Sequence, residues 1–156
     1  MPLLNRKIDY ALLILCYLHH KVEGGCAREI AGWFGISRPF VANILKDLCQ
    51  QGYVRSHRGV KGGYLLREQT GTRTLADLID ALDDTVQLAE CNSPQPEDCC
   101  SLAAYCPIRL PIAEVHNRIR EVLESVKLLD LFTLSTSIGD QSLQLDLSRC
   151  EKMPMN

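Results

Sequence analysis

The fold is decided by one stretch of the chain, AREIAGWFGISRPFVANILKDLCQQGYVRSHRGVKGGYLL, which spans residues 27–66. Its apolar spacing predicts a short helix over residues 27–34 and a turn at Gly35. A second helix is expected to begin at the N-cap candidate Ser37 and to end near residue 50. Two helices joined by a short turn that contains glycine are a known DNA-docking unit.

A β-hairpin is predicted directly after the second helix. Residues 53–57 and 64–66 resemble strands, and residues 58–63 form a glycine-rich tip between them. The predicted fold class is therefore mainly α with a small β-wing: a winged helix-turn-helix plus a long dimerisation helix. The alternative is an α+β structural domain that binds no DNA. Four basic residues favour DNA because they lie where phosphate and base contacts are made: Arg38, Arg55, Arg58 and Lys61.

Further helices are predicted on both sides of this unit. Residues 6–20 have helical spacing, and Thr74 with Asp77 resembles a capping box that opens a short helix. After Pro107 and Pro111, apolar residues recur at alternating spacings of three and four. This a/d seam predicts a partner helix and hence a homodimer. Its members are Ile112, Val115, Ile119, Val122, Val126 and Leu129.

The expected organisation has five regions. They are a DNA-binding winged helix-turn-helix (1–75), a connecting helix (76–90), a cysteine-rich loop (91–108), a dimerisation helix (109–131) and a C-terminal tail (132–156). Residues 1–75 carry eleven Lys and Arg against five Asp and Glu, a formal charge of +6. Residues 76–156 carry six Lys and Arg against fourteen Asp and Glu, a formal charge of −8. The net charge of −2 therefore averages a basic part, which is suited to nucleic acid, with an acidic part.

The composition, and the lack of a recognisable targeting signal, predict a cytoplasmic protein. With 156 residues, of which 46% are hydrophobic, the chain has the size and composition of a single globular domain. The apolar run at residues 11–18 is too short to cross a membrane and lacks a cleavage site, so neither a membrane nor secretion is expected. Thiols stay reduced in the cytoplasm, and a local cysteine cluster there indicates metal binding or redox chemistry.

Four cysteines lie close together, at Cys91, Cys99, Cys100 and Cys106. Their wide gaps suit an iron–sulfur cluster better than zinc, and adjacent cysteines rarely both bind one centre, so three of the four are expected to be ligands. Thiols without a metal are the alternative. Asp9 is a candidate fourth ligand, but the residues alone favour an acid that stabilises the start of a helix. No catalytic or nucleotide-binding motif appears, which argues against a redox enzyme.

The chain resembles the Rrf family of bacterial winged-helix regulators. The resemblance rests on the segments IDYALLIL, REIAGWFGISRPFVANILKDLCQQGYVRSHRGVKGGYLL and TLADLIDAL, and on the cysteine loop before a long helix. It implies a homodimeric transcription regulator that binds a palindromic operator in double-stranded DNA, and we expect this regulator to be a repressor. The residues expected to contact DNA are Arg28, Ser37, Arg38, Pro39, Phe40, Arg58, Gly59 and Lys61.

The resemblance also implies a cluster site. The family's spacing selects Cys100 with Cys91 and Cys106, while its rhizobial branch selects Cys99 instead of Cys100. The IscR branch has a histidine where this chain has Arg109, which argues against a two-iron cluster. In the NsrR branch, an aspartate equivalent to Asp9 comes from the partner subunit and binds a four-iron cluster.

The expected function is therefore operator binding controlled by an iron–sulfur cluster, [4Fe-4S] with [2Fe-2S] as the alternative. The signal is expected to be nitric oxide, redox state or iron supply. The alternative function is a thiol- or metal-based sensor without a cluster, in which Cys99 and Cys100 react.

Overall fold

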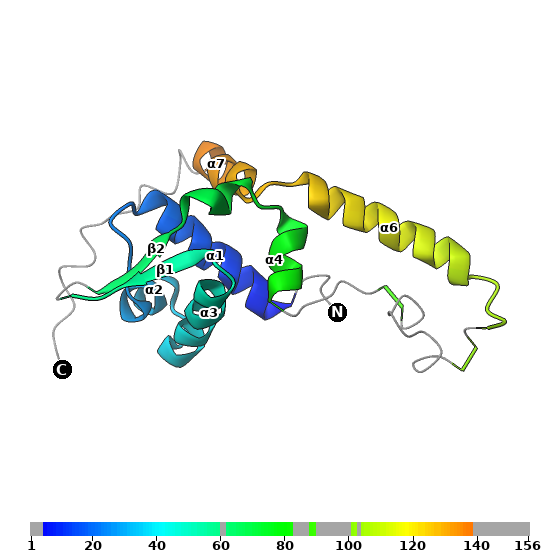
Figure 1. The fold of residues 1–156 in the computed structure, drawn as a ribbon, viewed down its shortest axis with the longest axis horizontal. Coiled ribbons are helices and arrows are strands. Elements are labelled where there is room, and N and C mark those ends of the chain that lie inside the picture. Colours follow the sequence, from blue (N-terminus) through cyan, green and yellow to red (C-terminus); the bar gives the residue numbers. More distant parts are fainter. Residues whose placement is uncertain (1–4, 60–61, 83–87, 90–100, 103, 139–156) are drawn as a thin grey trace.

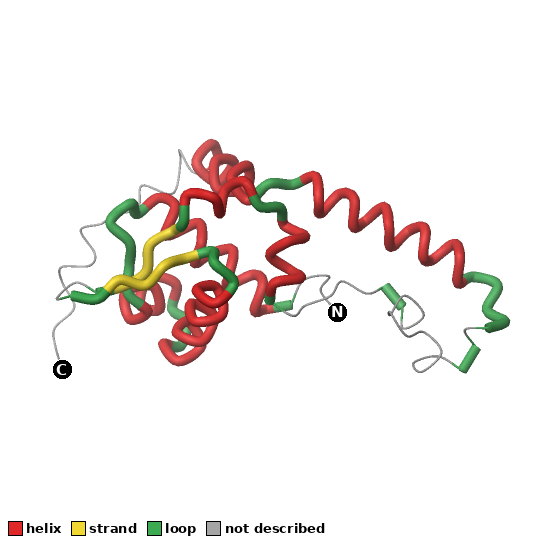
Figure 2. The backbone as a smooth tube through the Cα atoms, in the orientation of Figure 1, coloured by secondary structure: helices red, strands yellow, loops and turns green. Residues whose placement is uncertain are grey.

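The computed structural model describes residues 5–59, 62–82, 88–89, 101–102 and 104–138. This part of the chain is mostly helical and contains one small antiparallel sheet (Figures 1 and 2). The predicted fold class, a winged helix-turn-helix with a long helix, is confirmed.

Three helices form the N-terminal half: α1 (Arg6–His20), α2 (Ala27–Phe34) and α3 (Arg38–Gln50). Asn5 caps α1, since its side-chain oxygen accepts a hydrogen bond from the Ile8 amide at 3.0 Å. Gly35 ends α2 in the left-handed conformation (φ 66°), which glycine adopts without strain. The expected bounds of these helices agree with the structure to within one residue.

The wing consists of β1 (Val54–His57) and β2 (Gly63–Leu66), paired in the register Val54↔Leu66 and His57↔Gly63. A bridge between Gly25 and Tyr64 attaches the loop before α2 to the outer side of β2. This approach requires glycine: a Cβ on Gly24 would lie 2.4 Å from the Tyr64 carbonyl oxygen. The loop before α2 therefore holds β2 near the tip end of the wing.

A short 3₁₀ helix, η1 (Glu68–Thr72), leads from the wing to α4 (Leu75–Ala81). The predicted capping box is present at the start of α4. The Thr74 hydroxyl accepts from the Asp77 amide at 3.1 Å, and the Asp77 carboxylate accepts from the Thr74 amide at 2.8 Å.

The C-terminal helical region differs from the expectation of one helix over residues 109–131. The structure has two helices, α6 (Arg109–Ser125) and α7 (Leu128–Ile138), so the expectation is wrong beyond Ser125. The helix is interrupted between Ser125 and Leu128 because the backbone there forms hydrogen bonds with the segment at the start of α4. The Leu75 amide donates to the Val126 carbonyl at 2.8 Å, and the Leu128 amide donates to the Arg73 carbonyl at 2.9 Å.

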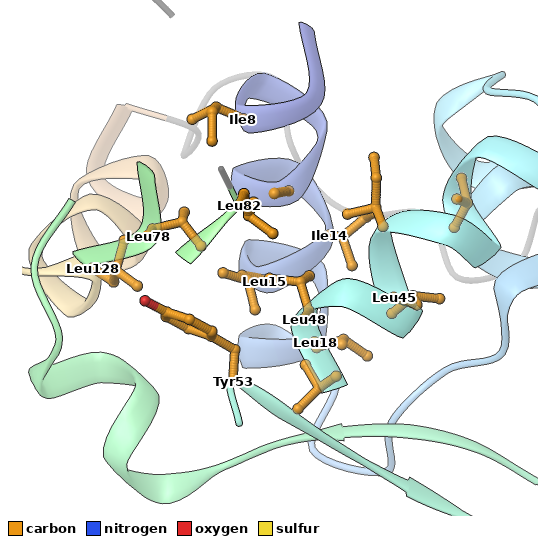
Figure 3. Close-up of a cluster of buried hydrophobic side chains, with 14 of the residues drawn as sticks. Ile8, Ile14, Leu15, Leu18, Leu45, Leu48, Tyr53, Leu78, Leu82 and Leu128 are labelled. Carbon is orange, nitrogen blue, oxygen red and sulfur yellow. The ribbon is translucent and has the colours of Figure 1, made fainter. Parts of the chain in front are cut away.

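Because of this interruption, α7 packs into the same hydrophobic core as the N-terminal helices (Figure 3). Leu128 and Phe132 of α7 are buried in that core together with residues of α1, α3, β1 and α4. Fully buried members include Ile8, Ile14, Leu15, Leu45, Leu48, Tyr53, Leu78 and Ile79. We call α1 to α4, the sheet and α7 the head. Helix α6 extends away from the head, and none of its residues is buried (Figure 1).

Candidate nucleic-acid interface and sensor residues

Helix α3 has one buried apolar face and one exposed polar face. Val41, Ile44, Leu45 and Leu48 are buried in the core. The expected DNA contacts Ser37, Arg38 and Pro39 lie exposed at the start of the helix. The unpaired amides of a helix N-terminus and a neighbouring arginine both attract phosphate, so this end of α3 is suited to the DNA backbone.

The exposed face of α3 continues with three polar residues that the sequence analysis did not select: Asn43, Lys46 and Gln50. Asn and Gln hydrogen-bond base edges, and Lys binds phosphate. These residues occupy the positions that the apolar periodicity leaves free, and this was the signal available in the sequence. They complete a polar strip along the helix.

Phe40 differs from the other expected DNA contacts. Its ring is half-buried and meets the ring of Tyr10 edge-on, with 5.4 Å between the centroids. The contact joins α3 to α1. This packing gives Phe40 a structural role, while its contact with DNA stays a prediction.

The wing and α2 provide further exposed basic residues. Arg55 on β1 and Arg58 at the tip are exposed, and Gly59 beside Arg58 has φ 142°. Arg28 is exposed on α2. Lys61 lies outside the described residues. The expected contacts that are described, apart from Phe40, are therefore accessible to a ligand.

The candidate cluster ligands are described only in part. Cys91, Cys99 and Cys100 lie outside the described residues. Cys106 carries a free, half-buried thiol three residues before α6, and Asp9 is exposed in the first turn of α1. In the described part of the chain no three His, Cys, Asp or Glu side chains gather as a metal site.

The positions of Cys106 and Asp9 restrict how the two side chains share one centre. The start of α6 lies far from α1 in the same chain (Figure 1). A thiolate next to α6 and a carboxylate on α1 are suitable donors for an iron–sulfur centre. Within one chain, therefore, the structure does not bring Cys106 and Asp9 to one centre.

Helix α6 is attached to the head by an ion pair with α4. Arg120 binds both oxygens of Asp80, at 2.9 and 2.5 Å, and also contacts Glu124 at 2.9 Å. The hydrogen bonds that Arg120 donates to Asp80 and Glu124 raise its pKa above its already high ordinary range. A bidentate pair of this kind fixes orientation as well as distance.

His116 lies one turn before Arg120, on the side of α6 that faces α4. It lines a small space of about 10 Å³ with Ala76, Ile79, Arg120 and Leu123. Its Nδ1 atom is buried and has no hydrogen-bond partner among the described residues. The sequence analysis did not select His116 or Arg120 for a role in this contact.

Lys7 contacts two other elements of the head. Its ammonium lies 2.8 Å from Asp47 Oδ2 on α3 and donates to the Leu82 carbonyl at 3.3 Å. Leu82 follows α4 directly and is buried. No local sequence pattern indicates this arrangement, because residues 7, 47 and 82 are brought together only by folding.

In the described part of the chain, no helix combines the length and apolar character that a membrane span requires.

Comparison with known proteins points to one class. Residues 4–133 match the sequence profile of Rrf2, described as an iron-dependent transcriptional regulator. Over 142 residues, 24% are identical to the HTH-type transcriptional regulator NsrR of Geobacillus kaustophilus, covering 89% of this chain and 91% of that protein.

Solved structures of similar fold include two named regulators. CymR (YrzC), the global cysteine regulator of B. subtilis, matches with a TM-score of 0.62 and 26% identity, covering 86% of this chain and 98% of the other. IscR of T. potens matches with a TM-score of 0.66 and 22% identity, covering 87% and 90%. At that identity the IscR match shows the fold alone.

Proposed function

Since this chain belongs to the Rrf2 family of transcriptional regulators, we propose that it is a homodimeric repressor whose operator binding is controlled by an iron–sulfur cluster. The observation that carries DNA binding is the two-faced α3. Its apolar face is fixed in the core, and its exposed face presents Arg38, Asn43 and Lys46. A rigid helix that presents such side chains is suited to the major groove.

Operator recognition is divided among these residues. Arg38 and Lys46 neutralise phosphates, which supplies most of the salt-dependent affinity. Asn43 is suited to the edge of an adenine, where an amide forms two hydrogen bonds. Arg58 at the exposed tip of the wing reaches the DNA backbone or the minor groove beside the helix.

The second copy binds along α6. Val115 is 47% exposed and Val122 62% exposed, and the two lie seven residues apart on one side of the helix. A narrow apolar strip of this spacing fits a partner helix. Two copies related by twofold symmetry present two α3 helices, and this symmetry matches a palindromic operator.

Four side chains would hold the cluster: Cys91, Cys100 and Cys106 from one chain and Asp9 from the other, with Cys99 as the alternative to Cys100. When bound, the cluster would supply a link that nitric oxide, oxygen or iron shortage removes. Cys106 lies next to α6 and Asp9 lies on α1, so these ligands would fix the start of α6 against the partner's head. Without this anchor, the two α3 helices would no longer be held at the operator's spacing.

The test is an anaerobic preparation analysed for iron, sulfide and absorbance, combined with binding to a duplex that the protein selects from a random pool. We expect a [4Fe-4S] spectrum and at least tenfold tighter binding by the loaded protein. Cys106→Ser and Asp9→Ala are expected to lose the spectrum. Cys49→Ser serves as the matched control, because Cys49 is a half-buried cysteine of the head. Equal affinity of the loaded and stripped protein would exclude cluster control.

A thiol-based sensor is the second candidate. The match to the cysteine regulator CymR favours it, as do the adjacent cysteines Cys99 and Cys100. A colourless anaerobic protein without iron, whose operator affinity changes when thiols are oxidised, would establish this alternative in place of the cluster.

A further inference from the structure

Lys7 joins three elements through one ammonium group. It projects from α1, pairs with Asp47 of α3 at 2.8 Å and donates to the carbonyl oxygen of Leu82 at 3.3 Å. The side chains of Lys7 and Asp47 are about one-third exposed, at 33% and 35%. Water therefore screens the pair only in part, and the contact is built into the head rather than lying free on its surface.

Lys7 holds two groups whose oxygen atoms carry a negative charge or a negative partial charge. Asp47 carries a carboxylate, and Leu82 lies at the carboxyl end of α4, where carbonyl groups lack partners within the helix and the helix dipole is negative. Without an intervening cation these groups would repel each other. The ammonium therefore fixes the distance between the end of α4 and the last turn of α3.

Leu82 is the last residue of the described range 62–82. Its side chain is buried in the cluster that contains α1 (Figure 3), and its carbonyl belongs to the peptide bond that leads into residue 83. The candidate ligands follow from Cys91 onward. Any change that rotates this peptide alters the acceptor of Lys7 directly.

Asp9, the candidate ligand on α1, lies two residues from Lys7. Two residues in an α-helix differ by about 200°, so the side chains leave opposite sides of the same rigid turn. Ile8 between them is fully buried and fixes that turn in the core. Lys7 and the candidate ligand Asp9 thus lie on opposite sides of one turn that the core holds in place.

We propose that Lys7 is a positioning residue that couples the carboxyl end of α4, at Leu82, to the recognition helix α3 through Asp47. The inference rests on the proposed function for its signal, the presence or loss of the cluster. The bridge that Lys7 forms between Asp47 and Leu82 makes a separate prediction. A disturbance at one end of the bridge reaches the other end, with or without a cluster.

The first test examines the bridge alone, by amide hydrogen exchange of the stripped protein. Asp47→Asn keeps the shape of the side chain and removes its charge. We expect exchange at the Leu82 amide, at the far end of the bridge, to rise about two- to fivefold. Lys7→Met is expected to raise exchange in both α3 and the end of α4, and Lys7→Arg to restore it. If Asp47→Asn changes exchange in α3 only, the proposal is wrong.

The second test measures the ratio of operator affinities of the anaerobic and stripped proteins. Lys7→Met is expected to reduce this ratio roughly three- to tenfold. Lys127→Met, which removes an exposed lysine outside the bridge, is the matched control and is expected to keep it. An equal fall in both affinities would mean a merely structural role and would overturn the proposal. A wild-type ratio of one instead refutes the proposed function, and the exchange experiment then decides the role of Lys7.

Discussion

Helices α3 and α6 have similar amphipathic patterns and opposite environments. Helix α3 buries Val41, Ile44, Leu45 and Leu48 in the core of its own chain. Helix α6 has apolar residues at the same spacings of three and four, yet it buries none of them. The comparison shows that periodicity predicts a helix and its apolar side, whereas the partner depends on what the rest of the chain places nearby.

The largest expected effect is in the head. Leu45→Ala removes a fully buried side chain and is expected to lower the free energy of unfolding by about 2–5 kcal/mol. Val122→Ala on α6 is the matched control, with an expected change below about 0.5 kcal/mol in dilute protein. Urea unfolding measures both. Equal losses would show that α6 is packed within its own chain as tightly as α3.

The next effect concerns association. Val115→Glu combined with Val122→Glu places two charges on the exposed apolar strip of α6. We expect the free energy of dimerisation to become less favourable by about 2–4 kcal/mol, measured by sedimentation at several concentrations. Asn117→Glu adds a charge to an exposed polar position of the same helix and serves as the control. A double variant that sediments like the wild type would place the dimer contact elsewhere.

The exposed face of α3 is expected to contribute to DNA binding. Arg38→Ala should weaken binding to the selected duplex by about 1–3 kcal/mol and reduce the salt dependence by roughly one phosphate contact. Arg118→Ala on α6 removes an exposed arginine outside the head and should leave affinity unchanged. Titrations at two salt concentrations measure the effect. Unchanged affinity in Arg38→Ala would remove this residue from the interface.

A smaller effect is expected at the contact between α6 and the head. Asp80→Asn weakens the bidentate contact with Arg120, whose side chain is 40% exposed. Solvent screening limits the expected loss of stability to about 0.5–1 kcal/mol, because Glu124 remains a partner of Arg120. Glu114→Gln, which breaks a more exposed pair within α6, should have a smaller effect. Hydrogen exchange at the start of α4 would show whether α6 has loosened.

The smallest effect is a pH dependence at the contact between α1 and α7. Burial against Phe132 lowers the pKa of His19 below its ordinary value of 6.5, and neighbouring His20 lowers it further. The unfolded chain therefore binds this proton more readily, so stability is full above pH 6.5 and declines as pH falls through the lower folded value. We expect His19→Gln to reduce the fall in Tm between pH 7.5 and 5.5 by about 1–2 °C. An unchanged fall would exclude His19 as its source.

Much of the head could be predicted from local sequence. The bounds of α1, α2 and α3, the capping box at Thr74 and the hairpin follow from short-range rules, because each depends on neighbours a few residues away. Phe40 illustrates the limit. The family resemblance suggested that Phe40 contacts DNA, but tertiary packing turns its ring towards Tyr10.

The candidate sensor was less accessible to such reasoning. The cysteine spacing indicates a centre, yet the choice between Cys99 and Cys100 depends on the shape of a loop that no periodicity describes. The proposed role of Asp9 as a ligand requires a second chain, since the start of α6 lies far from α1 in the same chain (Figure 1).

The sequence by itself determined the helices, the wing, the apolar side of each helix and the concentration of basic residues in the N-terminal half, because these features are local or compositional. Only the tertiary structure decided where the long C-terminal helix breaks, that Leu128 and Phe132 return to the core, and that Lys7 joins Asp47 to Leu82. These outcomes depend on backbone pairing and charge contacts between residues tens of positions apart, which become neighbours only when the core closes.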